Sequence, residues 1–289
     1  MRRDANHGKS RESRFEGRES CFSVRGFHLV SGIIGEGSER NATVAAKSQR
    51  FWEVDAARGV AILMMAVYHT VYDLDSFGGY AVDSTSGFWA RFADATATSF
   101  LFLVGVSLAI SHARAVRAGR DSFRKYLLRG LRVFGYGMLL TAVFWVFGLG
   151  YVVFGILHLI GVSIILSYPL LRHRLVNLLL GAVVLAAGFY MMGIGVSSES
   201  VWLSPFGVVP ENLPMPDYRP LFPWFGMVLL GLFAGNVVYG AGRTLTEGRA
   251  PFFVRPLLPL GRNSLFIYLV HQPFIIAALA AFGIISLGF

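Results

Sequence analysis

Residues 175–195, LVNLLLGAVVLAAGFYMMGIG, form a run of twenty-one residues that contains no charged side chain. An α-helix rises 1.5 Å per residue, so this run extends about 31 Å, which matches the ~30 Å hydrocarbon core of a bilayer. Apolar runs of similar length recur along the chain beyond residue 50. They predict an integral membrane protein built from helices.

The composition of the whole chain supports the same class. Hydrophobic residues make up 54% of the 289 residues and charged residues only 15%, with a mean hydropathy of +0.56, whereas soluble domains are about 25% charged. The single cysteine, Cys21, has no partner within the chain, which excludes a disulfide scaffold. The net charge of +9 would suggest nucleic acid for a soluble protein, but here we expect it to mark one side of the membrane, with no nucleic-acid partner.

We predict an all-α polytopic transmembrane helix bundle of about seven spans. The expected spans are 54–76, 92–112, 126–149, 151–171, 175–195, 221–241 and 263–287. In short loops Lys and Arg concentrate on the cytoplasmic side. If the N-terminus is cytoplasmic, the cytoplasmic gaps hold fourteen basic residues and the outer gaps hold two, Arg91 and Arg219. The asymmetry predicts a cytoplasmic N-terminus, an outer C-terminus and a multi-pass protein of the cell membrane.

Residues 1–50 differ in character from residues 51–289. The first fifty residues carry ten Lys or Arg, six Asp or Glu and no apolar run long enough to span, so we interpret them as a disordered basic tail or as a segment upstream of the true start. They do not fit a signal peptide, because Arg25, His28 and Ser31 interrupt the apolar part. Residues 51–289 are predicted to form one transmembrane domain.

Ionisable side chains recur inside the predicted spans, where each costs ~2.5 kcal/mol or more. His69 and Asp73 are spaced i, i+4, which places them on one helix face. We expect Asp73 to hold one imidazole nitrogen of His69 and to leave the other free as a general base. The alternative is a hydrogen-bonded pair that only pins two helices.

Two further histidines complete the set of candidate catalytic residues. His158 is predicted at nearly the same depth as His69, and His271 lies in a helical turn whose Pro273 cannot donate to the Leu269 carbonyl. His158 and His271 are candidates for stabilising an oxyanion or shuttling a proton, although a histidine satisfied by a backbone carbonyl is the purely structural alternative. No two of these histidines share a helix at ligand spacing, so we predict no metal site.

Polar and aromatic residues near the span ends supply candidate binding sites. Arg58, Arg262, Asn263 and Gln272 are candidates for a phosphate-bearing cofactor, because a guanidinium fork suits phosphate; lipid headgroups are the alternative ligand. Asp217, Tyr218 and Trp224 belong to a proline-rich outer segment that suits a sugar ring or a lipid. The pairs Gly231/Gly235 and Gly135/Gly137 predict close helix contacts.

Five collinear blocks of the chain from about Arg50 onward resemble the membrane-embedded family of the heparan-α-glucosaminide N-acetyltransferase catalytic domain, particularly its shorter prokaryotic members. The blocks are Glu53–Gly59 with Tyr68–Leu74, Phe100–Ser107, Gly155–Gly161, Asp217–Gly226 and Leu260–Pro273. The resemblance implies acetyl transfer from cytosolic acetyl-CoA to an amine or hydroxyl of a saccharide or glycolipid beyond the membrane, with membrane lipids around the protein and a possible homo-oligomer.

The sequence departs from the family at one point. The resemblance places a catalytic histidine in the loop after the first span, but residues 76–91 contain none, so His69 takes this role in our hypothesis by proximity and chemistry. A proton-coupled transporter and a non-catalytic membrane scaffold are the alternative functions.

Overall fold

A computed structural model describes residues 51–146, 152–198, 200–208, 217–240 and 248–285. The tail predicted for residues 1–50 lies outside them. The described helices form one compact unit, Phe51–Phe289. They are α2 (Trp52–Gly78), α3 (Gly87–Arg117), α4 (Phe123–Val146), α5 (Ile156–Leu166), α6 (Arg174–Ile194), α7 (Leu221–Val238), α8 (Leu257–Arg262) and α9 (Ser264–Ala281), with short 3₁₀ turns η1 (Tyr168–Leu170), η2 (Val201–Phe206) and η3 (Phe252–Val254).

Six of these helices, α2, α3, α4, α6, α7 and α9, are long and apolar enough to cross a membrane. The prediction of an all-α polytopic bundle is confirmed. The expected span 151–171 contains the shorter helix α5, which rises only about 17 Å and is followed by η1. It is short because Gly155 has an extended backbone before it and Pro169 cannot donate a helical hydrogen bond after it.

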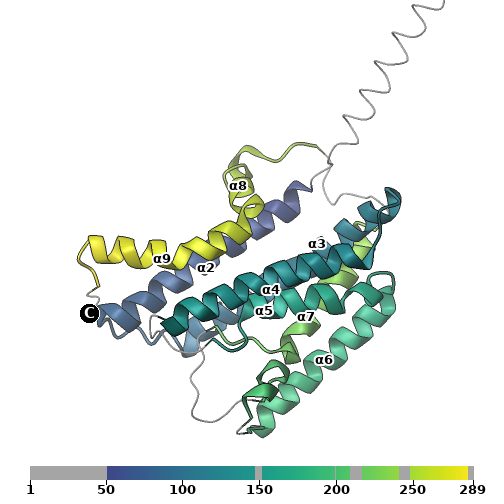
Figure 1. Cartoon of the computed structure of the whole chain (residues 1–289). Helices are drawn as coiled ribbons and strands as arrows, with labels where there is room; N and C mark the ends of the chain where they lie inside the picture. Colours follow the sequence, from purple (N-terminus) through teal and green to yellow (C-terminus); the bar gives the residue numbers. More distant parts are fainter. Residues whose placement is uncertain (1–50, 147–151, 199, 209–216, 241–247, 286–289) are drawn as a thin grey trace, which may run out of the picture. The chain divides into compact units, whose positions relative to one another are not determined.

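The helices pack in a defined order of neighbours, which Figure 1 shows. Helices α8 and α9 contact α2, α2 contacts α3, α3 contacts α7, and α7 contacts α6. Helix α4 packs along α5, which also touches α3 and α7. Leucines from α3, α5 and α7, including Leu108, Leu159 and Leu229, are fully buried in the core between these helices.

Glycines allow α3 and α7 to approach closely. A Cβ atom at Gly105 would lie 2.0 Å from the Val228 carbonyl oxygen, and one at Gly231 would lie 2.0 Å from the Phe102 carbonyl oxygen. Gly235 contributes to the same contact, so the close helix contact predicted at Gly231 and Gly235 is confirmed.

The second glycine pair behaves differently at its two positions. A Cβ atom at Gly137 would lie 3.0 Å from the imidazole ring of His158, so this glycine makes room for the ring. A Cβ atom at Gly135 would meet nothing within 4 Å. The predicted close contact is therefore wrong for Gly135. Gly135 and Gly137 are two positions apart, and residues with that spacing point to different faces of a helix.

Candidate functional site

A pair of imidazoles lies between α2 and α9. The rings of His69 and His271 contact each other edge to face, with centroids 4.7 Å apart and planes inclined by 65°. His271 is buried, and its Nδ1 lies 2.6 Å from the carbonyl oxygen of Tyr268. A carbonyl oxygen only accepts, so Nδ1 carries the hydrogen and Nε2 of the neutral ring keeps its lone pair. This Nε2 is buried with no hydrogen-bond partner among the described residues.

Asp73 does not orient His69 as the sequence led us to expect. The fully buried Asp73 accepts a 2.6 Å hydrogen bond from Nε2 of Gln272 on α9. His69 Nδ1, the second oxygen of Asp73 and Oε1 of Gln272 are buried without hydrogen-bond partners in the described part of the chain. The amide of Gln272 supplies a donor across the helix interface, and the His69 ring packs on His271 instead.

Unsatisfied buried polar atoms are rare in folded proteins because each costs ~1–3 kcal/mol. Four such atoms gather here, on His69, Asp73, His271 and Gln272. The α2–α9 interface therefore has spare hydrogen-bonding capacity that a polar ligand would satisfy.

His158 on α5 has the opposite hydrogen-bonding state. Its Nδ1 accepts from the backbone N–H of Gly155 at 3.2 Å, so Nε2 of the neutral ring carries the hydrogen. Nε2 is buried and has no acceptor among the described residues. The ring packs on Phe134 and Phe154, with centroids 5.0 and 5.9 Å away. No ring contact joins it to His69 within the described ranges, so a shared depth does not bring these two together.

Asp217 links the helices that carry these histidines. One oxygen of its carboxylate accepts from the Tyr268 hydroxyl of α9 at 3.0 Å and from the backbone N–H of Ile156 at 3.3 Å. One side of the residue stays open to solvent, yet the surrounding protein displaces enough water to raise the pKa of the carboxyl above its usual value. The nearby charge of Arg219 and the two hydrogen bonds oppose this effect.

Tyr218 and Trp224, which we also predicted to bind a sugar ring or a lipid, follow Asp217 in the chain. Arg219 pairs with Asp94 of α3 at 3.2 Å, and its guanidinium lies 4.6 Å from the ring centroid of Trp224. The Tyr218 hydroxyl donates to the Ser204 carbonyl at 2.6 Å, and burial raises its pKa to about 12. Tyr218 thus holds this segment against η2, whereas Trp224 and Arg219 form a stacked surface.

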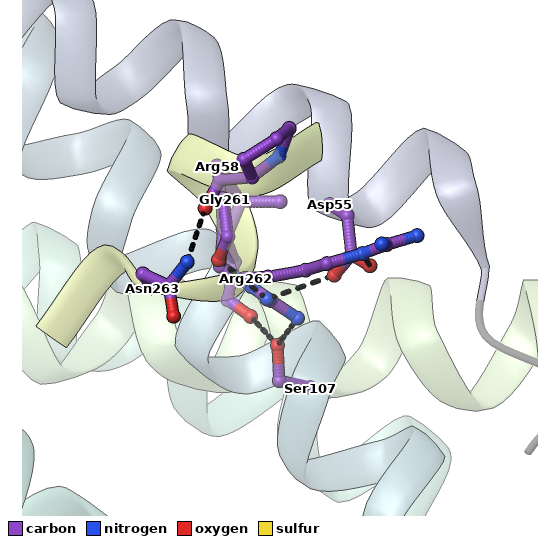
Figure 2. Close-up of polar contacts among 8 residues, drawn as sticks. Asp55, Arg58, Ser107, Gly261, Arg262 and Asn263 are labelled. Atoms are coloured by element: carbon purple, nitrogen blue, oxygen red, sulfur yellow. Dashed lines mark hydrogen bonds and ion pairs between the residues drawn. The ribbon is translucent and has the colours of Figure 1, made fainter. Parts of the chain in front are cut away.

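A charged cluster joins α2, α3 and α8 (Figure 2). Nη1 of Arg58 donates to Asp55 at 3.0 Å and to the Gly261 carbonyl at 3.1 Å, and Nη2 donates to Ser107 at 3.3 Å. Arg262 Nε lies 3.4 Å from the second oxygen of Asp55. Two guanidinium groups thus share one carboxylate.

The structure separates the four residues predicted to bind a cofactor. Arg58 and Arg262 meet through Asp55, and Asn263 is next to Arg262, where it donates to the Pro259 carbonyl at 2.9 Å. Gln272 lies nine residues further along the chain, a helical rise of about 14 Å, and bonds to Asp73. Gln272 therefore belongs with the imidazole pair.

A second polar cluster was not predicted from the sequence. The buried His112 of α3 lies 3.4 Å from both Asp121 and the Tyr126 hydroxyl, and Arg172 pairs with Asp121 at 3.0 Å. These contacts tie the loop between α3 and α4 to the turn before α6. The signal in the sequence was His112 itself, an ionisable residue at the end of an apolar run. Among the described residues, no group of three or more His, Cys, Asp or Glu side chains could hold a metal ion.

Comparison with known proteins gives one match. The family model described as "Heparan-alpha-glucosaminide N-acetyltransferase, catalytic" matches residues 50–273. The matched range includes both histidines of the α2–α9 interface, His158, Asp217 and the charged cluster around Arg58. No curated protein and no solved structure matches the chain.

Proposed function

Because the chain belongs to the heparan-α-glucosaminide N-acetyltransferase catalytic family, we propose that it moves an acetyl group from acetyl-CoA to an amine or hydroxyl of a saccharide or glycolipid across the membrane. The family assigns it to membrane acetyltransferase-like proteins. The donor, the acceptor and the residue roles below are our proposal.

The donor end of the site is the cluster of Arg58 and Arg262. Guanidinium groups bind phosphate oxygens in bidentate geometry, and this end of the bundle is the arginine-rich end that we predict to face the cytoplasm. His69 lies eleven residues beyond Arg58 on α2, a rise of about 17 Å. An extended pantetheine arm covers a distance of this order, so phosphates held at Arg58 would leave the thioester near the imidazole pair.

The imidazole pair would carry the proton transfer, with His271 rather than the expected His69 as the base, because Asp73 does not orient His69. His271 Nε2, with its free lone pair, takes the proton from the acceptor as the acceptor oxygen or nitrogen bonds to the thioester carbonyl carbon. The carbon–sulfur bond then breaks, and the thiolate of CoA leaves. His69, 4.7 Å away between ring centroids, would pass the proton from His271 to the thiolate, which completes CoA and regenerates the base. A transient acyl-histidine on His69 is the alternative route.

His158 stays a candidate donor for the negative charge on the carbonyl oxygen, which requires the bound substrate to bring that oxygen to α5, because no ring contact joins His158 to the imidazole pair among the described residues. Its Nε2–H is a fixed donor without an acceptor among the described residues, and donors placed before the reaction contribute most to such stabilisation. Asp217, Arg219 and Trp224 would bind the acceptor, since a carboxylate and an aromatic face together suit the hydroxyls and the apolar face of a sugar ring. Asp217 would hold the acceptor in a fixed position relative to His271, because Tyr268 bonds to Asp217 through its hydroxyl and to His271 through its carbonyl.

One observation carries the proposal, namely that His271 presents a buried Nε2 with a lone pair and no partner among the described residues, beside a second imidazole. The test is acetyl transfer by the purified protein from labelled acetyl-CoA to a panel of saccharides and glycolipids. His271→Ala should lower turnover by about 10²–10⁴-fold, whereas the matched variant of an exposed histidine, His173→Ala, should leave it unchanged. Turnover that survives His271→Ala, or no turnover with any acceptor, contradicts the mechanism.

A proton-coupled transporter is the second candidate function, because the rings of His69 and His271 are in contact and the buried Asp73 bonds to Gln272, the residue after His271. This function predicts solute flux into proteoliposomes that follows an imposed pH gradient and stops in His271→Ala. Acetyl transfer without such flux would exclude it.

A further inference from the structure

The turn between α7 and α8 presents an apolar tip. Phe252 and Phe253 of η3 are 80% and 69% exposed. Their rings are in contact with each other, with centroids 5.9 Å apart and planes at 88°. Among the described residues no other ring contacts them. Two adjacent phenylalanines therefore project from the protein as a pair.

The backbone fixes this tip in place. Val254 N–H donates to the Pro251 carbonyl at 3.1 Å, and Arg255 N–H donates to the Phe252 carbonyl at 3.3 Å. The Arg255 side chain closes the turn, because its Nε donates to the Ala250 carbonyl at 3.3 Å. The phenylalanines are thus held outward by a hydrogen-bonded turn.

Both charged residues of the described tip, residues 248–255, are arginines. Arg249 and Arg255 flank the two phenylalanines and are both exposed. Residues 248–285 contain Arg249, Arg255 and Arg262 and no Asp or Glu, and the nearest acidic residue in the sequence, Glu247, lies outside the described residues. Arg262 belongs to the charged cluster with Asp55 of α2, so Arg249 and Arg255 are the cations that flank the tip in the sequence.

We propose that residues 249–255 bind an anionic phospholipid. Its headgroup phosphate would lie between Arg249 and Arg255, and Phe252 and Phe253 would enter the boundary between headgroups and acyl chains. A cationic rim around exposed aromatic side chains is the arrangement that binds anionic membrane surfaces. A second copy of the chain is disfavoured as the occupant, because a two-fold interface uses the same patch on both subunits and residues 248–255 carry two arginines and no acidic residue to pair with them. This inference does not depend on acetyl transfer.

The test measures lipid binding to the purified full chain in detergent. Labelled phosphatidylglycerol, labelled phosphatidylcholine and inorganic phosphate are titrated separately, and retained lipid is identified by native mass spectrometry. Phosphatidylglycerol should bind in preference to phosphatidylcholine. The binding free energy that one arginine contributes near an anionic surface corresponds to about a five-fold change in affinity. Arg249→Gln should therefore weaken binding about five-fold. The double variant Arg249→Gln/Arg255→Gln should weaken it about thirty-fold.

Matched variants separate this site from general positive charge. Arg120→Gln/Arg124→Gln removes two exposed arginines, one from the loop between α3 and α4 and one from the first turn of α4, and should change affinity less than two-fold. Phe252→Ser/Phe253→Ser keeps both arginines and should weaken lipid binding on the order of ten-fold or more. Arg249→Gln alone retains the bond from Arg255 to Ala250, so it reports binding even if the double variant folds poorly.

Three outcomes would overturn the proposal. The first is equal loss in the Arg120/Arg124 variant, which would indicate unspecific charge. The second is displacement of phosphatidylglycerol by equimolar inorganic phosphate, which would assign the site to free phosphate. The third is a wild-type dimer that becomes monomeric in Phe252→Ser/Phe253→Ser without any change in lipid binding, which would make the tip a contact between copies.

Discussion

Replacing Gly261 by alanine should separate α8 from α2 and disrupt the charged cluster. A Cβ atom at this position would lie 1.7 Å from the Asp55 carbonyl oxygen and 2.7 Å from its carbonyl carbon. Both are backbone atoms, so no side-chain rotation relieves the overlap. Ordinary contact begins at 3.4 Å, so the two backbones must move apart by the difference between 3.4 and 1.7, which is 1.7 Å.

This displacement acts directly on the bonds that hold Arg58 and Arg262. The 3.1 Å bond from Arg58 to the Gly261 carbonyl and the 3.4 Å contact of Arg262 with Asp55 both exceed hydrogen-bonding distance after such a shift. Overpacking costs about 1–3 kcal/mol, and the loss of a charged hydrogen bond costs about 1.5–3 kcal/mol. We expect the free energy of unfolding to fall by about 2.5–6 kcal/mol and the affinity for acetyl-CoA to fall at least ten-fold.

Thermal unfolding followed by circular dichroism in detergent and calorimetric titration with acetyl-CoA measure the two effects. Gly135→Ala is the matched control, because a Cβ atom there meets nothing within 4 Å. In the interior of α4 it should be neutral or stabilising by about 0.5–1 kcal/mol. If Gly261→Ala unfolds at the same temperature as Gly135→Ala and binds acetyl-CoA like the wild type, the account of this cluster is refuted.

Three further variants test other parts of the structure. Gln272→Leu removes the donor to the buried Asp73 and should lower the unfolding free energy by about 1–3 kcal/mol; an unchanged melting temperature would show that the bond contributes nothing. The raised pKa of Asp217 means that the folded state holds this proton more tightly than the unfolded chain, so stability should fall as pH rises from the ordinary carboxyl pKa through the raised one. Melting temperatures measured against pH should lose that slope in Asp217→Asn, and a slope that persists would assign it to another group. Gly231→Ala would place a Cβ atom 2.0 Å from a carbonyl oxygen of α3 and should lower the melting temperature through the α3–α7 contact, whereas a wild-type value would show that this contact adapts freely.

The long helices could be predicted from the sequence because an uninterrupted apolar run of about twenty residues has few alternatives in a membrane. The expected spans 92–112 and 175–195 lie within or nearly coincide with α3 and α6. The span expected at 151–171 was predicted too long, because hydropathy alone does not register the interruption of the helix by Gly155 and Pro169.

Contacts between helices were harder to predict than the helices themselves. The i, i+4 spacing of His69 and Asp73 gives a shared face, but it does not give the helix that packs on that face. Asp73 and Gln272 are separated by 199 positions, and their bond depends on the register of α9 along α2. The facing of His69 and His271 depends on the same register. A single sequence shows which residues could form this site, but it does not show how far α9 is shifted along α2.

In the proposed function, acetyl-CoA binds near Arg58 on one side of the membrane, and the acceptor binds near Asp217 on the other side. The most direct test uses sealed proteoliposomes of one protein orientation, with labelled acetyl-CoA on the side of Arg58 and an impermeant saccharide acceptor only on the opposite side. We predict acetylated acceptor in the compartment that never received acetyl-CoA, and its loss in His271→Ala. Acetylation that occurs only when the donor and the acceptor share a compartment would contradict the account.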